Sequence, residues 1–444
     1  MMDWFKLLSP KRFGDSNLQN TEATRSRFEQ DYDRIIFSHP FRKLQDKTQV
    51  FPLPEDDFVH TRLTHSLEVS SVGRSLGKNA GTFLLKKYPE LKKAGFTIND
   101  FGGITGAACL AHDLGNPPFG HSGEDSISSF FLTNPIGLEF KKKVSPEEWN
   151  DLINFEGNAQ GFRILNSSAN GGLKLTFATL GAFTKYPISS SGEKEKGRKS
   201  QKKYGYCQSN AQLFEEMAGD MELVELGRKK WCRHPLAFLV EAADDICYHI
   251  IDLEDGCRLG LIPFDQVKNL LASIIGSAFS EEKLSKIPSL NQKLGTLRAM
   301  AINVLIRECS EAFEQHEAGM LDGSFDQALT NLIPSARALK EIIELSIREI
   351  YQSKQVLEKE AGGYEVIDNL IESFSVAAYS SGFESPQPKH ASILKLLPEE
   401  FEVQLAEELS VYNTLQIIID FVSGLTDSHA VRLYQTIKGY RLPV

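Results

Sequence analysis

The chain has 444 residues, of which 41% are hydrophobic, and it carries a formal net charge of −10. This length allows one large or two ordinary domains with a sizeable core, and the acidic balance disfavours binding of nucleic acid or anionic membranes by the surface as a whole, though not by a local basic patch. The six cysteines form no C-x-x-C pair, which predicts free thiols. The N-terminus has no apolar signal region, and no run of about 20 apolar residues occurs. We therefore predict a cytoplasmic protein without a transmembrane helix.

Helical spacing of apolar residues dominates the chain, whereas strand-like alternation is scarce. We therefore predict an all-α protein, with at most a small hairpin near Gln49 to His60. The predicted helices are His65 to Tyr88, Ile104 to Asp113, Gly123 to Leu132, Gly157 to Leu165, Pro235 to Glu254, Leu297 to Glu317, Ala336 to Leu357 and much of Pro398 to Lys438.

Residues 110–124, which read LAHDLGNPPFGHSGE, are the most informative segment. They place His112 and Asp113 at the end of a predicted helix. Glycines and prolines then impose a non-helical turn that brings the chain to His121 and Glu124. Side chains held on such a path are positioned for something other than core packing. The pattern is typical of a metal centre beside an acid/base pair.

His121 and Glu124 stand three residues apart at the start of the next predicted helix. A histidine oriented by a carboxylate can donate or accept a proton near neutral pH. Glu124 also suits the positive end of a helix dipole as a first-turn acid. Both roles can hold at once, so the two residues form a candidate acid/base pair.

Residues 189–203 read SSSGEKEKGRKSQKK, a polar and charged composition. It predicts a mobile loop or a linker. The character of the chain changes abruptly at KKYGY, from Lys202 to Tyr206. The segment is therefore expected to dock on the protein after a flexible stretch.

The predicted helix from Pro235 to Glu254 is apolar on most of its faces, which indicates a central, buried helix. Acids inside such a helix are costly unless they bind something. Asp244, Tyr248 and Asp252 fall at i, i+4 and i+8 and share one side of the helix. Asp245 points about 100° away. Asp244 is therefore the better candidate for a ligand.

Two histidines and two acids could together hold a divalent cation. The candidates are His65 near the start of one helix, His112 and Asp113 at the end of another, and Asp244. Each of them has an ordinary structural explanation when taken alone. Taken together they predict a metal centre for Mn²⁺, Mg²⁺, Fe²⁺ or Zn²⁺. Mixed nitrogen and oxygen ligands without thiolate argue against a structural zinc site of the cysteine type.

The sequence resembles the HD-domain superfamily and, more narrowly, bacterial deoxyguanosine triphosphate triphosphohydrolases and their vertebrate dNTP-hydrolysing relatives. The matching segments span nearly the whole chain in the family's order, and the match is weakest over about Leu261 to Ser410. Besides residues 110–124, they are FRKLQDKTQVFP (Phe41 to Pro52), HTRLTHSLEV (His60 to Val69), FEGNAQGFRIL (Phe155 to Leu165), KKYGY, EAADDICYHIIDLED (Glu241 to Asp255) and DFVSGLTDSHAVRLY (Asp420 to Tyr434).

The resemblance implies hydrolysis of a deoxynucleoside triphosphate, with dGTP first, to deoxynucleoside and inorganic triphosphate by attack at the α-phosphorus. It implies the four metal ligands already named, with His121 as proton carrier and Glu124 orienting it. The substrate contacts that it implies are Arg62 and Lys203 at phosphate oxygens with Tyr204 close by, Gln45 and Asp252 at the 3′-hydroxyl, and Tyr248 against the sugar where a 2′-hydroxyl would sit.

The resemblance also implies an HD-domain catalytic core over residues 1–260, with additional helices over 261–444 packed on it. A homo-oligomer is expected, commonly a hexamer in this family, together with a role in control of dNTP pools and single-stranded DNA as a candidate effector. Base preference, the metal and the order of the oligomer stay open.

Two other functions compete with this one. Another HD phosphohydrolase could act on cyclic dinucleotides, (p)ppGpp or a nucleoside monophosphate. The alarmone hydrolases place an acidic pair soon after the His-Asp pair, where this chain has Leu114, Gly115 and Asn116. A nucleic-acid-binding regulator that senses nucleotides is the second alternative, and the basic stretch from Lys194 to Lys203 supports it.

Overall fold

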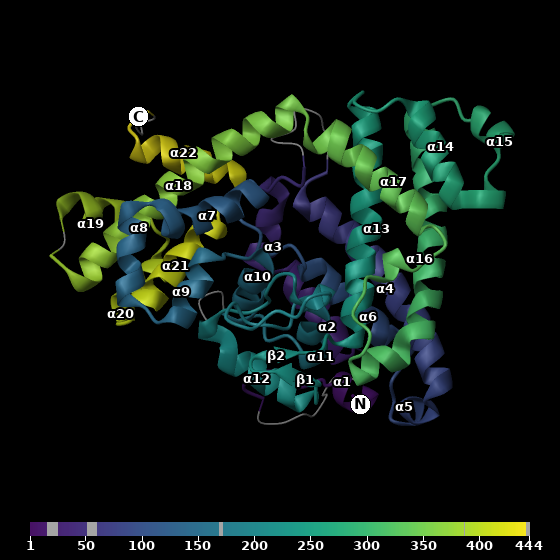
Figure 1. Ribbon diagram of the computed structural model, residues 1–444, viewed down its shortest axis with the longest axis horizontal. Coiled ribbons are helices and arrows are strands. Elements are labelled where there is room, and N and C mark those ends of the chain that lie inside the picture. Colours follow the sequence, from purple (N-terminus) through teal and green to yellow (C-terminus); the bar gives the residue numbers. More distant parts are fainter. Residues whose placement is uncertain (16–24, 51–59, 168–171, 386, 441–444) are drawn as a thin grey trace.

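The computed structural model describes residues 1–444 except 16–24, 51–59, 168–171, 386 and 441–444. Over these residues almost all of the regular secondary structure is helical, which confirms the predicted all-α class (Figure 1). A two-stranded antiparallel sheet joins β1 (Glu225–Gly227) to β2 (Lys230–Trp231). Most of the hairpin expected near residues 49–60 lies outside the described residues, and its described flanks form one isolated antiparallel bridge between Thr48 and Thr61.

Three long helices form the centre of the fold: α4 (Arg62–Lys87), α6 (Ile98–Ala111) and α13 (Pro235–Arg258). Helices α4 and α6 approach closely because small residues line their contact. A Cβ added at Gly77 would lie 2.1 Å from Thr105 Oγ1. Helix α13 is buried on most sides, as its all-round apolar sequence predicts. This packing leaves the start of α4, the end of α6 and the middle of α13 beside one another.

Two hydrophobic clusters make up the core. The larger surrounds α4, α6 and α13 and includes α2 (Arg27–Ile36) and α16 (Leu290–Asp322). The second joins α7 (His121–Thr133) and α9 (Pro146–Ile153) to the C-terminal helices described next. Helices from both sides of residue 260 enter each cluster. The predicted division at that residue, with C-terminal helices packed on a catalytic core, stays a prediction.

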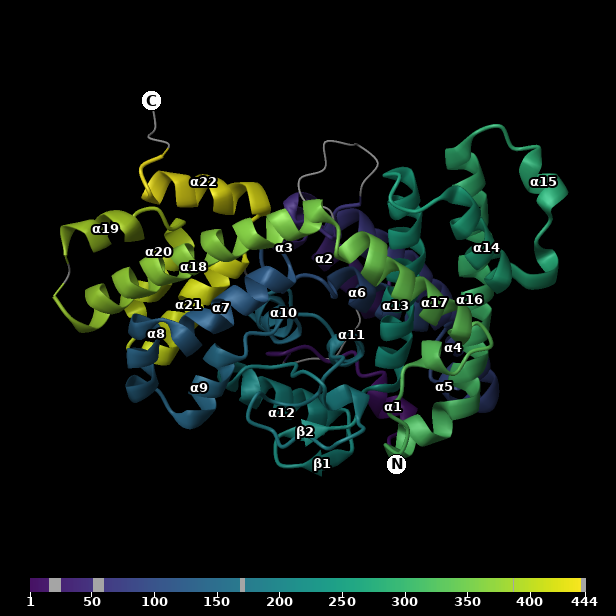
Figure 2. The same ribbon diagram turned by 45° about the horizontal axis from the view of Figure 1, so that its top comes forward.

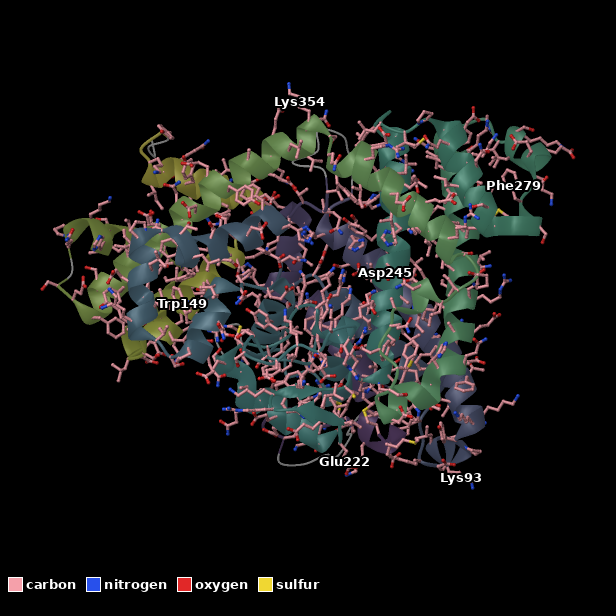
Figure 3. All side chains as sticks on the ribbon, in the orientation of Figure 1. Lys93, Trp149, Glu222, Asp245, Phe279 and Lys354 are labelled. Atoms are coloured by element: carbon pink, nitrogen blue, oxygen red, sulfur yellow. The ribbon has the colours of Figure 1, made fainter. Side chains whose placement is uncertain are left out.

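The C-terminal part of the second cluster consists of α18 (Lys354–Phe383), α21 (Val411–Ser423) and α22 (Asp427–Ile437). Figure 2 shows α18 running from the neighbourhood of α17 (Ala336–Ser346) across the molecule to α19 (Pro388–Leu394). In Figure 3, Trp149 lies in this second cluster, whereas Asp245 lies in the middle of the molecule and Lys93 at its edge. Helix α18 thus extends from one cluster to the other.

The remaining elements are short. They are α1 (Trp4–Leu7), α3 (His39–Lys43), α5 (Pro89–Lys93), α8 (Pro135–Glu139), α10 (Gly157–Asn166), α11 (Phe177–Phe183), α12 (Ala211–Asp220), α14 (Phe264–Ile275), α15 (Glu281–Ser285), α17 (Ala336–Ser346), α19 (Pro388–Leu394) and α20 (Glu399–Glu407), with 3₁₀ turns at Leu44–Asp46, Phe140–Lys143, Lys199–Gln201, Gln208–Asn210, Gly276–Ala278 and Leu329–Asn331 and a π-helical turn at Ile347–Tyr351. None of the helices in the described part of the chain is long and apolar enough to cross a membrane.

The segment 189–203 differs from the mobile loop that its composition predicts. Ser200 donates to Asp326 through its backbone N–H, at 3.2 Å, and through its hydroxyl, at 2.8 Å. Arg198 donates to the carbonyl of Gly323 at 2.9 Å. These long-range contacts fix the segment on the larger cluster, in keeping with the docking expected at its end.

Candidate active site

The start of α4, the end of α6 and the middle of α13 bring the four predicted metal ligands together. His65 lies in the first turn of α4, which Thr61 caps by accepting a hydrogen bond from the N–H of Thr64. His112 follows directly after α6, and Asp113 comes next. One ligand atom from each of His65, His112 and Asp113 lies within 4.8 Å of the others. The site therefore joins segments that are about 50 positions apart in the sequence.

Asp244 on α13 completes this group. Its Oδ1 lies 3.3 Å from Nε2 of His65 and 3.5 Å from Nε2 of His112. Although burial acts to raise the pKa of Asp244, the neighbouring His112, the hydrogen bond from His65 and the charge of Lys185 hold it well below its usual range. Asp245 points elsewhere, because its Oδ2 accepts a hydrogen bond from the Thr330 hydroxyl at 2.7 Å. The structure thus separates the two adjacent acids as helical geometry predicts.

The ring of His112 shows that this group suits a cation. Its Nδ1 lies 2.6 Å from the carbonyl oxygen of Cys109, which can only accept, so Nδ1 carries a proton. In a neutral ring, Nε2 then presents a lone pair. Nε2 is buried without a hydrogen-bond partner among the described residues. It faces Asp113 Oδ1 at 3.6 Å and Asp244 Oδ1 at 3.5 Å.

A lone pair directed at two carboxylate oxygens is electrostatically unfavourable unless a cation lies between them. The donor set of two imidazoles and two carboxylates matches that of a divalent transition metal or Mg²⁺. The hydrogen bond to Cys109 O also fixes the tautomer, as is usual for histidines that bind metals. The residues present therefore fit a divalent cation.

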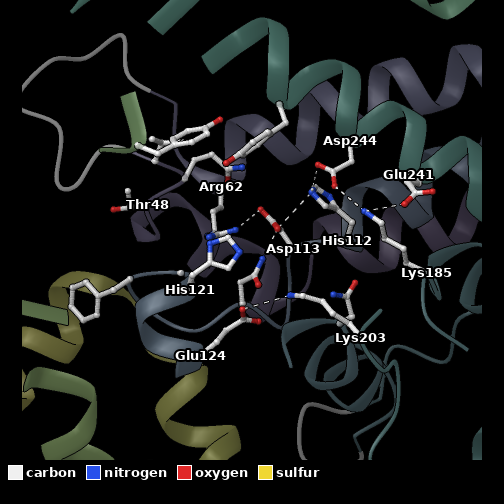
Figure 4. Close-up of a pocket in the computed structure, with 18 of the residues that line it drawn as sticks. Thr48, Arg62, His112, Asp113, His121, Glu124, Lys185, Lys203, Glu241 and Asp244 are labelled. Atoms are coloured by element: carbon white, nitrogen blue, oxygen red, sulfur yellow. Dashed lines mark hydrogen bonds and ion pairs between the residues drawn. The ribbon is translucent and has the colours of Figure 1, made fainter. Parts of the chain in front are cut away.

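A cavity of about 420 Å³ opens beside this group (Figure 4). Figure 4 shows Arg62 and His121 on one side of Asp113, with His112 and Asp244 on the other. The cavity is large enough for a small ligand. Its wall includes Thr48, Arg62, His112, Asp113, Asn116, His121, Glu124, Lys185, Tyr186, Lys203, Glu241, Asp244, Tyr248, Tyr351 and Lys359.

His121 is the first residue of α7 and faces this pocket. Two residues with left-handed backbone precede it, Phe119 with φ 63° and Gly120 with φ 61°. A Cβ at Gly120 would lie 2.9 Å from Nη2 of Arg62, so this position favours glycine. Within the described chain His121 has no hydrogen-bond partner. Burial of the ring, followed by the charges of Lys203 and Arg62, lowers the pKa of His121 below its ordinary value.

Glu124 also lines the pocket but is held by other groups. Its Oε1 accepts the backbone N–H of Gly157 at 2.7 Å, and its Oε2 lies 3.8 Å from Nζ of Lys203. Burial and the nearby carboxylate of Glu156 raise the pKa of Glu124 to about 7. The structure therefore brings Glu124 and His121 to one wall without a hydrogen bond between them, and the orienting role of Glu124 stays a prediction.

Four cations converge on the described wall of the cavity, the fourth being Lys359. Arg62 donates to Asp113 Oδ2 at 2.9 Å, and Lys203 Nζ lies 3.1 Å from a carboxylate oxygen of Glu156. Sequence reasoning missed the third, Lys185, whose Nζ lies 3.7 Å from Asp244 Oδ2 and 3.8 Å from Glu241 Oε1. Lys185 lies two residues after the apolar helix α11, a position that carries no functional signal of its own.

The predicted sugar contacts are only partly brought together. Tyr248 lines the pocket, and Asp252 is buried behind it. Asp252 Oδ2 accepts a hydrogen bond at 2.6 Å from the hydroxyl of Tyr351, a pocket residue that sequence reasoning missed. Tyr351 belongs to the π-helical turn, a feature frequent at functional sites.

Gln45 and Tyr204 lie outside the pocket wall that the described residues form. Gln45 is an exposed residue of a 3₁₀ turn. The ring of Tyr204 is buried, and its hydroxyl donates to the carbonyl of Asp151 at 3.3 Å. Their contacts with a substrate stay predictions.

The basic stretch 194–203 is engaged within the protein. Lys199 Nζ lies 3.3 Å from Glu241 Oε1, and Lys203 is paired with Glu156. Lys194 donates to the carbonyl of Lys202 at 2.9 Å. The stretch therefore gives little support to the alternative of a nucleic-acid-binding regulator.

Two family models match the chain, an HD domain at residues 62–149 and a phosphohydrolase-associated domain at residues 333–436. A deoxyguanosinetriphosphate triphosphohydrolase-like protein of Synechocystis sp. is 41% identical, over 99% of this chain and 100% of that protein. One of the same name from Pseudomonas aeruginosa is 38% identical over 100% of both chains. A Yersinia enterocolitica protein named deoxyguanosinetriphosphate triphosphohydrolase is 29% identical, over 98% of this chain and 99% of that protein.

Proposed function

We propose a reaction for this chain on the basis of its family, since it belongs to the HD-domain family of deoxyguanosinetriphosphate triphosphohydrolases and their like-named relatives. In this proposal it hydrolyses deoxynucleoside triphosphates, with dGTP as the preferred substrate, to deoxynucleoside and inorganic triphosphate. The observation that carries the proposal is the meeting of the His112 metal group with Arg62, Lys185 and Lys203 in one pocket. An acidic chain that concentrates cations in a cavity is suited to a polyanionic ligand.

Each cation is already paired with a carboxylate, and this arrangement can exchange partners. Arg62 pairs with Asp113, Lys203 with Glu156, and Lys185 with Asp244 and Glu241. Phosphate oxygens that enter the pocket offer these cations further charge-assisted hydrogen bonds. His65, His112, Asp113 and Asp244 would hold the cation. A divalent ion there supplies charge neutralisation at phosphate oxygens and a lower pKa for a nearby water.

His121 is the candidate proton donor for the leaving group. When water attacks the α-phosphorus and the bond from phosphorus to the 5′-oxygen breaks, the 5′-oxygen must gain a proton. A histidine that lines the pocket without a partner among the described residues is free to deliver it. The lowered pKa makes its protonated form a stronger acid but leaves less of that form at neutral pH.

The deoxyribose would lie along α13. Tyr248 on the pocket wall would occupy the space of a 2′-hydroxyl, and Asp252 with Gln45 would meet the 3′-hydroxyl. A homo-oligomer, commonly a hexamer in this family, control of dNTP pools and an effect of single-stranded DNA remain part of the proposal, as do Mg²⁺ or Mn²⁺ as the metal and Fe²⁺ or Zn²⁺ as alternatives.

Product analysis tests the proposal. The purified protein is stripped with a chelator, reloaded with Mn²⁺ or Mg²⁺, and incubated with the four dNTPs and with GTP. We expect metal-dependent release of deoxynucleoside and intact triphosphate, with dGTP turned over fastest. His112→Ala should lose both metal and turnover. The control is His316→Ala, because His316 lies on α16 with its ring stacked on Phe325, and this variant should keep both. Release of monophosphate and pyrophosphate, or no turnover of any dNTP, would overturn it.

A further inference from the structure

A buried carboxylate of the C-terminal helices contacts the turn that leads into His121. Asp427 is the first residue of α22 and is 1% exposed. Its Oδ1 accepts the backbone N–H of Phe119 at 3.0 Å. Its Oδ2 accepts the N–H of Thr48 at 3.1 Å, the hydroxyl of Thr48 at 2.6 Å and Nζ of Lys359 at 3.1 Å. One side chain thus joins three segments that are far apart in the sequence.

The turn that Asp427 contacts has an unusual backbone. Phe119 has φ 63°, a left-handed conformation that side chains with a Cβ rarely adopt. Such a residue persists only where its surroundings hold it, and it occurs most often at functional sites. The hydrogen bond from its N–H to Asp427 is one restraint. The next two residues are Gly120, also left-handed, and His121, so the direction of the imidazole depends on this turn.

The other side of Phe119 is held by α18. A Cβ at Gly363 would lie 2.9 Å from Cβ of Phe119, so the helix backbone approaches this residue directly. The ammonium group of Lys359, one turn earlier on α18, lies 5.7 Å from the centre of the Phe119 ring. The turn before His121 is therefore enclosed between α18 and the start of α22.

A second contact ties the same C-terminal region to the metal group. Lys47 Nζ donates to the carbonyl of Ser423 at 2.7 Å and to the carbonyl of Asn116 at 2.6 Å. The side chain of Asn116 in turn donates to Asp113 Oδ1 at 2.5 Å. Residues after 420 thus reach both ends of the segment that carries Asp113 and His121.

We propose that Asp427 is a positioning residue, which holds the turn at Phe119 and Gly120 so that His121 faces the pocket, and that the phosphohydrolase-associated region thereby completes the active site. The expected effect of Asp427 on turnover rests on the proposed function, whereas its expected effect on the structure of the turn does not. Asp427 acts through the backbone of this turn and is not itself part of the described pocket wall.

The first test compares two ion-paired acids of the C-terminal region, Asp427 and Asp420. Asp427→Asn keeps the volume but turns an amide N–H₂ towards Phe119 N–H or towards Thr48 and Lys359, all of which are donors. The matched control is Asp420→Asn, because Asp420 accepts from Gln160 and Arg163 and does not contact the turn. Each variant is measured for metal content, kcat and KM with dGTP, and hydrogen exchange of the peptide 114–124.

We expect Asp427→Asn to keep its metal, to lose about 10- to 100-fold in kcat with a smaller change in KM, and to exchange hydrogen faster over 114–124. Asp420→Asn should keep wild-type kcat and exchange in that peptide. An equal loss in both variants, or wild-type kcat and exchange in Asp427→Asn, would overturn the proposal.

A second pair of variants keeps the test decisive if Asp427→Asn does not fold. Gly363→Ala places a Cβ against Phe119, whereas Gly362→Ala places one in open space on the same helix. We expect faster exchange over 114–124 and lower kcat in Gly363→Ala alone. Identical behaviour of the two variants would contradict the proposal. If wild-type protein turns over no dNTP, the proposed function fails while the exchange data still decide the role of Asp427.

Discussion

Two adjacent acids on α13 meet different surroundings. Asp244 lies within 3.5 Å of both ligand histidines, whereas Asp245 accepts a hydrogen bond from Thr330. Removing one of four ligands disrupts a metal site. We therefore predict that Asp244→Asn loses metal and turnover, and that Asp245→Asn, the matched control, keeps both. Elemental analysis of the purified variants checks this, and the opposite order would identify Asp245 as the ligand.

His121 lines the same pocket as the candidate metal ligands but stands across Asp113 from His112 and Asp244 (Figure 4). We predict that His121→Ala retains metal and dNTP affinity while kcat falls by about 10²- to 10⁴-fold, the range for losing a general acid or base. Glu124→Gln should lose less, because Glu124 contacts Gly157 and Lys203 rather than the imidazole.

Single-turnover kinetics, with metal content and dNTP affinity measured in parallel, decide the role of His121. Lost metal in His121→Ala would make His121 a ligand. Near-normal turnover would make it a structural residue.

Helix α13 presents the candidate ligand Asp244 and the tyrosine Tyr248 on one side. Tyr248 follows Asp244 by one helical turn and lines the pocket. We predict that Tyr248→Ala narrows the difference in kcat/KM between dGTP and GTP, because the ring is the proposed barrier to a 2′-hydroxyl. Tyr248→Phe keeps the ring and should keep the discrimination. If a folded Tyr248→Ala stays as selective as the wild type, another residue selects deoxyribose.

The long helices were predictable because their signals are local. The apolar periodicity of α13 and the glycines and prolines after α6 determine their own neighbourhood. The predicted helix from Ala336 to Leu357 is instead α17, a π-helical turn and the start of α18. Its apolar spacing continues through the turn, so periodicity gave no sign of the break.

The candidate site shows the same limit. His112, Asp113 and His121 share one short segment, so the motif indicates them together. Lys185 and Tyr351 become pocket residues only when distant segments meet across the fold. No local pattern in the sequence carries that information, and fold-wide contacts such as Tyr351 with Asp252 decide it.

At the scale of the whole molecule, Lys47 lies where the two clusters meet. Its ammonium group donates to Asn116 O and Ser423 O, and burial, followed by the charge of Arg62, lowers its pKa from 10.5 to about 7. Between these two values the unfolded chain binds more protons than the folded chain. The free energy of unfolding should therefore rise with pH across this window.

We predict that titration of Lys47 makes the unfolding free energy rise by up to about 1.4 kcal/mol per pH unit. The variant Lys47→Met should lack this slope. Urea unfolding of both proteins at pH 7, 8 and 9, in chelator, measures it. The difference in unfolding free energy should shift steadily in favour of the wild type as pH rises. Parallel curves for the two proteins would show that Lys47 titrates normally.

The account as a whole depends on which bond of the nucleotide breaks. Turnover of dGTP in water enriched in ¹⁸O, followed by mass spectrometry of both products, tests this most directly. Attack at the α-phosphorus with departure of the 5′-oxygen predicts one ¹⁸O in the released triphosphate and none in deoxyguanosine. Label in the nucleoside, or products that are dGMP and pyrophosphate, would contradict the account.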